Sequence, residues 1–218
     1  GVSSDRMCSD CAVGHYQSQE NAKECVACTA GKFRDMLQPA SSSESAACQT
    51  CGTGRYQDVA GQTSCVQCAA GKFRTSAAPS TSEDVACSAC GAGRYQDLAG
   101  QPSCLKCGVG KYRDGAANAS SVEPIACRVC GAGEFQPADS QVSCIKCAVG
   151  KFRTQEPASA AESTACRTCD ESGAGTFQDE AGQMQCKPKS TCPAGEGQVV
   201  SGGVTADRQC ALCVRINA

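Results

Sequence analysis

The sequence contains few of the large apolar side chains that fill an ordinary protein core. Phenylalanine, tyrosine and tryptophan together make up 4% of its 218 residues, and tryptophan is absent. Alanine and 22 cysteines, about one residue in ten, supply much of the 41% hydrophobic fraction. We therefore expect covalent cross-links or metal ions, rather than a conventional core, to hold the fold.

Other absences exclude function classes. The 20 basic and 22 acidic residues leave a net charge of -2, which argues against a nucleic-acid-binding protein. No run of 18 apolar residues occurs, so we expect no insertion into a membrane. His15 is the single histidine, too few for catalytic groups repeated along the chain, and we expect neither an enzyme nor a cofactor. The chain opens on Gly1 without an initiator methionine, so we expect a processed product or an internal fragment.

Cysteines recur at a strict period, which is typical of a repeat protein. Five first cysteines lie 40, 39, 40 and 39 residues apart, and each has a partner three residues later. A second cysteine doublet lies within each period, although in the fifth period Cys186 and Cys192 are more widely spaced. The spacing predicts repeats over residues 8–47, 48–86, 87–126, 127–165 and 166–209, the last divergent with an insertion, and a truncated sixth repeat over residues 210–218.

All nine aromatic residues fill one slot, two positions after a glycine that follows a cysteine doublet. They are Tyr16, Phe33, Tyr56, Phe73, Tyr95, Tyr112, Phe135, Phe152 and Phe177. A half-repeat of about 20 residues is too small for a true core, so we predict that one ring lying on a disulfide forms its hydrophobic centre. The glycine suits a tight turn with a positive φ.

We expect little regular secondary structure. The glycine-x-aromatic segments predict short strands, and the longer halves, rich in serine, threonine, alanine and proline, predict surface loops. The expected fold class is a set of small disulfide-rich repeats, arranged as an elongated ladder of short β-hairpins in which each unit contacts mainly its neighbours.

The cysteine doublets suit either disulfides or zinc. Eleven doublets would leave one over from four-cysteine zinc sites, and the repeat length and balanced charge favour an extracellular disulfide framework. The favoured scheme closes each loop from one doublet to the next, each closure contributing roughly 3 kcal/mol. Its pairs are Cys11–Cys25, Cys28–Cys48, Cys51–Cys65, Cys68–Cys87, Cys90–Cys104, Cys107–Cys127, Cys130–Cys144, Cys147–Cys166, Cys169–Cys186 and Cys192–Cys210.

A competing scheme pairs cysteines within each block of four, as in Cys8–Cys25 with Cys11–Cys28, and sequence alone leaves both open. The favoured scheme leaves Cys8 and Cys213 over. One hypothesis is a head-to-tail disulfide between two chains, and the alternative is that these cysteines pair elsewhere.

The pattern C-x-x-C-x-x-G-x-[YF], followed by a loop to the next doublet, runs from Cys8 to about Cys210. It resembles the cysteine-rich repeats of the ephrin-receptor-like and tumour-necrosis-factor-receptor-like group. The resemblance implies an extracellular, elongated, non-enzymatic ladder of disulfide hairpins, as in receptor ectodomains, adhesion proteins and surface proteins of protists and algae. Unlike signalling receptors, the repeats are very uniform and offer few exposed aromatic or leucine anchors.

Two surface features recur. The charges Lys32, Lys72, Lys111 and Lys151, Arg34, Arg74, Arg113 and Arg153, and Glu44, Glu83, Glu123 and Glu162 repeat with the period. They predict a solvated face, or rows that pair between neighbouring rods. Asn118 begins the one N-glycosylation sequon, and serines near Pro39, Pro79 and Pro124 resemble sites of O-linked glycans.

Together these features predict an extracellular or cell-surface structural protein. We expect a disulfide-stapled rod that builds a filament, a surface appendage or a matrix through head-to-tail or lateral contacts with copies of itself. The alternative is the stalk of a receptor or adhesion ectodomain that binds a protein ligand. An intracellular zinc protein is a third hypothesis.

Overall fold

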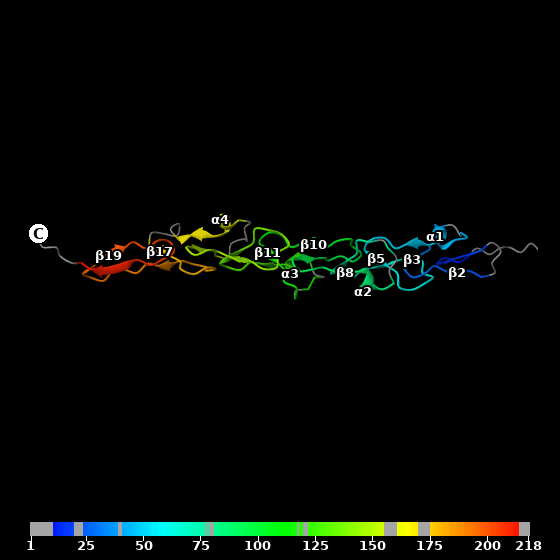
Figure 1. The fold of residues 1–218 in the computed structure, drawn as a ribbon, viewed down its shortest axis with the longest axis horizontal. Coiled ribbons are helices and arrows are strands. Elements are labelled where there is room, and N and C mark those ends of the chain that lie inside the picture. The colour runs from blue at the N-terminus through cyan, green and yellow to red at the C-terminus, as the bar shows by residue number, and fades with distance from the viewer. Residues whose placement is uncertain are drawn as a thin grey trace, which may run out of the picture. The chain divides into compact units, whose positions relative to one another are not determined.

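The computed structural model describes residues 11–19, 24–38, 41–76, 78, 81–116, 118–119, 122–154, 161–169 and 175–213 (Figure 1). The chain forms two compact units, one drawn from residues 1–91, 95–105 and 118–122 and the other from residues 92–94, 106–117 and 123–218. Both units are built from one element, a two-stranded hairpin closed by a disulfide.

The described residues form ten two-stranded sheets, each joining two strands that follow one another in the sequence. The pairs are β1 (His15–Tyr16) with β2 (Val26–Ala27), β3 (Lys32–Phe33) with β4 (Gln49–Thr50), β5 (Arg55–Tyr56) with β6 (Val66–Gln67), β7 (Lys72–Phe73) with β8 (Ser88–Ala89), β9 (Arg94–Tyr95) with β10 (Leu105–Lys106), β11 (Lys111–Tyr112) with β12 (Arg128–Val129), β13 (Glu134–Phe135) with β14 (Ile145–Lys146), β15 (Lys151–Phe152) with β16 (Arg167–Thr168), β17 (Thr176–Phe177) with β18 (Lys187–Pro188), and β19 (Glu196–Val200) with β20 (Gln209–Leu212). The predicted class, a ladder of small disulfide-rich hairpins, is confirmed.

Ten disulfides close these hairpins, and they join the same ten pairs as the favoured loop-closing scheme. The pair Cys11–Cys25 is incompatible with both bridges of the competing scheme. We call the five hairpins closed over 14 or 17 residues short hairpins, and the five closed over 18 to 20 residues long hairpins. With these sulfur atoms oxidised, the part of the chain that the structure describes contains no cluster of side chains suited to a metal ion.

The long hairpins contain four one-turn helices that the sequence did not predict. They are α1 (Glu44–Ala47), α2 (Glu83–Ala86), α3 (Glu123–Ala126) and α4 (Glu162–Ala165). Each begins with a glutamate and ends at the closing cysteine, as at Cys48, whose backbone is extended again (φ -105°, ψ 121°). The expectation of loops throughout these halves was therefore wrong, because four residues are too few to show a helical period in the sequence.

The aromatic rings pack differently from the prediction. Tyr16 packs against Cys28, Ala47 and Cys48, which belong to the following long hairpin. Tyr56 likewise contacts the next disulfide, and Phe135 shares a buried cluster with Cys147, Ala165 and Cys166. These rings thus lie on the disulfide and helix of the next hairpin, rather than forming a centre for their own. A hairpin of about 20 residues completes its apolar cluster only with its neighbour.

Candidate functional site

The contacts between successive hairpins form the most regular polar arrangement in the structure. In each hairpin, the glycine before the ring has a positive φ, as in Gly14 (78°) and Gly31 (88°). Its backbone amide donates to a carbonyl of the next hairpin, over 2.8 Å from Gly14 to Arg34 and 2.7 Å from Gly31 to Gln57. The same bonds recur, with lengths of 2.7 to 2.9 Å, at Gly54, Gly71, Gly93, Gly110, Gly133 and Gly150.

Glycine is required in the short hairpins for a second reason. A Cβ on Gly54 would overlap the backbone carbonyl of Gly100, in the short hairpin of the following repeat, and lie 3.0 Å from the nitrogen of Gln101. Gly133 meets the carbonyl of Gly182 in the same way. The chain therefore approaches itself backbone to backbone between positions about 46 to 49 residues apart, and only a residue without a side chain fits.

Buried arginines fasten each long hairpin to the short hairpin before it. Arg34 is 5% exposed, and its Nη1 donates to the carbonyls of Cys11 (3.1 Å), Ala12 (3.0 Å) and His15 (2.8 Å). Arg74 reaches the carbonyl of Arg55 in the same way, and burial lowers the pKa of its guanidinium. Arg113 and Arg153, 4% and 3% exposed, occupy the equivalent position. One planar guanidinium thus satisfies several carbonyls that would otherwise lack donors.

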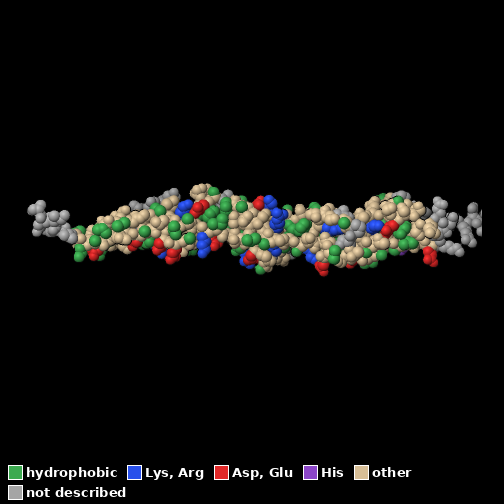
Figure 2. Space-filling model, in the orientation of Figure 1, with side chains coloured by type: hydrophobic (Ala, Val, Ile, Leu, Met, Phe, Trp, Pro, Cys, Tyr) green, Lys and Arg blue, Asp and Glu red, His purple; other side chains and the backbone are tan. Residues whose placement is uncertain are grey.

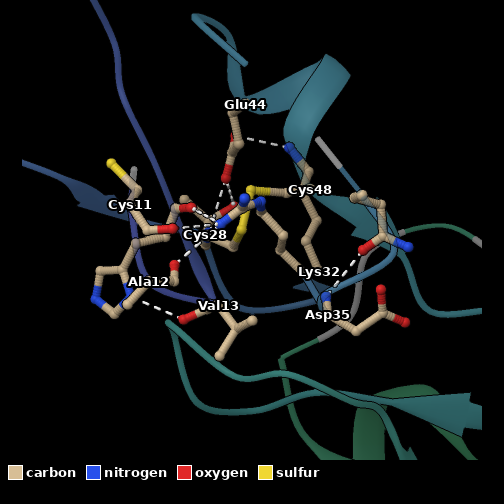
Figure 3. The surroundings of a disulfide bond; sticks show 12 residues. Cys11, Ala12, Val13, Cys28, Lys32, Asp35, Glu44 and Cys48 are labelled. Carbon is tan, nitrogen blue, oxygen red and sulfur yellow. Dashed lines mark hydrogen bonds and ion pairs between the residues drawn. A yellow bond between two sulfur atoms is a disulfide. The ribbon is translucent and has the colours of Figure 1, made fainter. Parts of the chain in front are cut away.

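The recurring lysine and glutamate form a clamp within each long hairpin (Figure 3). Lys32 Nζ lies 2.7 Å from Glu44 Oε2, beside the Cys28–Cys48 disulfide. The other carboxylate oxygen accepts from the amide (2.8 Å) and hydroxyl (2.6 Å) of Thr29. Partial burial opposes the charged form, but the bonds from Lys32 and Thr29 outweigh it and lower the pKa of Glu44 to about 2.

The equivalent clamps are Lys72–Glu83 (3.5 Å), Lys111–Glu123 (2.9 Å) and Lys151–Glu162 (3.4 Å). Neither prediction for the repeated charges describes them. The lysines and glutamates pair within one hairpin instead of between rods, and the arginines are buried instead of solvated. The spacing of the residues is that of a hairpin fold, since each pair lies 12 residues apart in the sequence or one fewer.

A glutamine after each short-hairpin ring holds the turn that follows. Gln57 is 4% exposed, its Nε2 donates to the carbonyl of Ser64 (2.7 Å), and its Oε1 accepts from the amide of Val59 (2.9 Å). Gln96, Gln136 and Gln178 do the same in their own hairpins. Sequence reasoning noticed this repeated glutamine without assigning it a role. A polar residue repeated beside every buried ring was the available signal.

The last long hairpin, Cys192–Cys210, departs from the others. Gln198 stands where the earlier long hairpins have their arginine. Arg208, from the opposite strand, lies nearby instead: its Nη2 would be 3.7 Å from a Cβ on Gly175. A guanidinium therefore reaches the preceding short hairpin here too, but from another position in the sequence.

The remaining predicted sites are scattered. Cys213 is exposed and forms no disulfide within the described residues, while Cys8 lies outside them. Asn118 is exposed, as a glycan acceptor must be, and the serine that completes its sequon lies outside the described residues. The Nδ1 of His15 lies 3.2 Å from the carbonyl oxygen of Val13.

The surface offers more apolar anchors than the sequence led us to expect. All four leucines are exposed: Leu37 88%, Leu98 60%, Leu105 45% and Leu212 75%. Met36 is 88% exposed as well, and with Leu37 and Val13 it lines an open pocket. Figure 2 shows basic and acidic side chains interspersed over the visible face, without a patch of one sign. In the described part of the chain, none of the helices has the length and apolar character needed to cross a bilayer.

Comparison with known families follows this architecture. Residues 173–210 match the TNFR/NGFR cysteine-rich region. No curated protein matches the chain. Four segments, residues 2–38, 38–85, 78–123 and 118–166, match the family described as tyrosine-protein kinase ephrin type A/B receptor-like. Cysteine-rich repeats of these receptor types, stapled by disulfides, are extracellular, and so is this protein. The ephrin-type segments together span residues 2–166, 165 of 218 residues, and the chain therefore belongs to the ephrin type A/B receptor-like family of cysteine-rich repeats.

Proposed function

We propose that the chain is a non-enzymatic structural building block, a stiff spacer within an extracellular filament, surface appendage or matrix. The observation that carries this proposal is the repeated junction. Within each unit, successive hairpins are joined by the same glycine amide bond of 2.7 to 2.9 Å. They also share rings, as Tyr16 does with the Cys28–Cys48 disulfide. A chain with bonded junctions in place of flexible linkers resists bending and presents the same surface at regular steps.

Small-angle X-ray scattering of the oxidised, full-length chain tests the proposal. We expect the scattering of a stiff rod, and we expect Arg74→Met to shift it toward a more flexible chain because three carbonyls of the preceding hairpin lose their donor. Arg55→Met is the matched control, since the Arg55 side chain is exposed. Scattering from the unmodified chain typical of a random coil or a compact globule would refute the proposal.

A second candidate is the stalk of a receptor or adhesion ectodomain that binds a protein ligand. It is favoured by Met36 and Leu37, whose near-complete exposure is typical of side chains that a partner covers. The equivalent residues of the next two long hairpins are Ser76 with Ala77 and Gly115 with Ala116. Loss of cell-surface binding in a Met36→Ser, Leu37→Ser double variant, with the scattering unchanged, would favour this candidate.

A further inference from the structure

The hairpin Cys192–Cys210 presents an uncovered copy of the junction. Gly195 has a φ of 89°, close to the 88° of Gly31 and 84° of Gly71. In the earlier long hairpins this glycine amide donates to a glutamine carbonyl of the next short hairpin, at 2.7 to 2.8 Å. Gly195 has open space around its Cβ position, and its amide has no hydrogen-bond partner among the described residues.

Cys213 marks the same face independently. Its amide donates to the carbonyl of Gly195 over 2.9 Å, which is the bond that Cys51 makes to Gly31. Cys51, Cys90, Cys130 and Cys169 hold the equivalent position in the preceding junctions and are 1%, 5%, 4% and 0% exposed. Cys213 is exposed. The backbone thus has the conformation of a covered junction, while the covering hairpin is not there.

We propose that the face formed by Gly195 and Cys213 is a docking site for a short hairpin of a second copy of this chain, joined head to tail. The argument is continuity with an interface that the chain already builds. At Gly31, Gly71, Gly110 and Gly150 the occupant of this face is a short hairpin, and the carbonyl that accepts the glycine amide belongs to the glutamine after its ring. The chemistry of the occupant is therefore that of the protein itself.

The first short hairpin, Cys11–Cys25, carries the matching sequence. Gly14, Tyr16 and Gln17 hold the positions of Gly54, Tyr56 and Gln57. A contact between unlike ends of identical chains extends without closing, and so generates a filament. The inference rests on the proposed function, because it supplies the joint by which the building block repeats.

Mass photometry and sedimentation velocity of the oxidised chain over a range of concentrations test the docking. We expect dimers and longer species, and an association at least about tenfold weaker in Gly195→Asn, because its side chain fills the contact face and obstructs a buried hydrogen bond. Asparagine tolerates a positive φ, so the hairpin should still fold, which an intact Cys192–Cys210 bridge would verify. Gly203→Asn, in the same hairpin and without a positive φ, is the control and should associate normally.

Alkylation of Cys213, followed by peptide mass spectrometry, supplies a second readout. Docking should make this thiol react at least about tenfold more slowly at associating concentrations, since its covered equivalents are at most 5% exposed. Cys213→Ser should still associate, because the contact is non-covalent. A chain that stays monomeric to ~100 µM, or a Gly195→Asn chain that associates normally, would overturn the inference. Either failure would leave the rod-like scattering of the single chain, and hence the proposed function, intact.

Discussion

The junction glycines allow the cost of backbone contact to be separated from the cost of backbone strain. Three glycines of one hairpin differ in these two respects. Gly52 has neither a positive φ nor an atom within 4 Å of its Cβ position. Gly61 has a φ of 75°, but its Cβ would meet His15 no closer than 3.4 Å, which is ordinary contact. Gly54 has a φ of 72° and would overlap Gly100.

The three alanine substitutions should therefore form a series. Gly52→Ala should be neutral or stabilise by up to about 1 kcal/mol, through reduced entropy of the unfolded chain. Gly61→Ala should cost about 1 to 2 kcal/mol for the left-handed conformation alone. Gly54→Ala adds an overlap with backbone that only separation of the two hairpins relieves, with loss of bonds worth about 1 kcal/mol each. We expect a total of about 3 kcal/mol or more.

Hydrogen exchange of the oxidised protein measures these costs locally, where a stapled chain does not unfold completely. The reporting amides are Cys68, bonded to the Gly54 carbonyl over 2.8 Å, and Gly100, bonded to the Cys68 carbonyl over 2.8 Å. Gly54→Ala should accelerate their exchange by about 100-fold, and Gly61→Ala by about tenfold. Equal effects of Gly54→Ala and Gly61→Ala would refute the close approach of the backbones.

Three further outcomes are expected. Because the folded pKa of Glu44 lies near 2, below its ordinary value of 4.5, its carboxylate stabilises the fold fully above that value; about 1 to 2 kcal/mol should be lost as the pH falls from 4.5 toward 2, and Glu44→Gln should abolish this part of the acid titration of stability. Phe135→Ala should cost about 3 kcal/mol and speed reduction of the neighbouring Cys147–Cys166 bridge in differential alkylation, whereas faster reduction of the bridge in its own hairpin alone would contradict the packing across the junction. Asn118 should carry an N-linked glycan when the protein is secreted from eukaryotic cells, so peptide N-glycosidase should lower the mass of the native protein and leave Asn118→Gln unchanged.

Several features were readable without the structure because they depend on distance along the chain. The doublet spacing closes one hairpin between Cys51 and Cys65 and the next between Cys68 and Cys87, since loops of 14 to 20 residues are the shortest that join successive doublets. The slot shared by nine aromatic residues located the strands, and the positive φ at Gly54 followed from its place in a tight turn.

The sequence by itself determined the unit of this protein: a hairpin, its bridge, its ring and its turn. Tertiary structure alone decided how one unit holds the next. Arg34 and Lys32 lie two residues apart and look alike in the sequence, yet one is buried against the carbonyls of an earlier hairpin and the other pairs with Glu44 in its own. The reason is that stacking brings together groups 20 to 50 residues apart, and a repeated charge or ring carries no mark of which neighbour it will face.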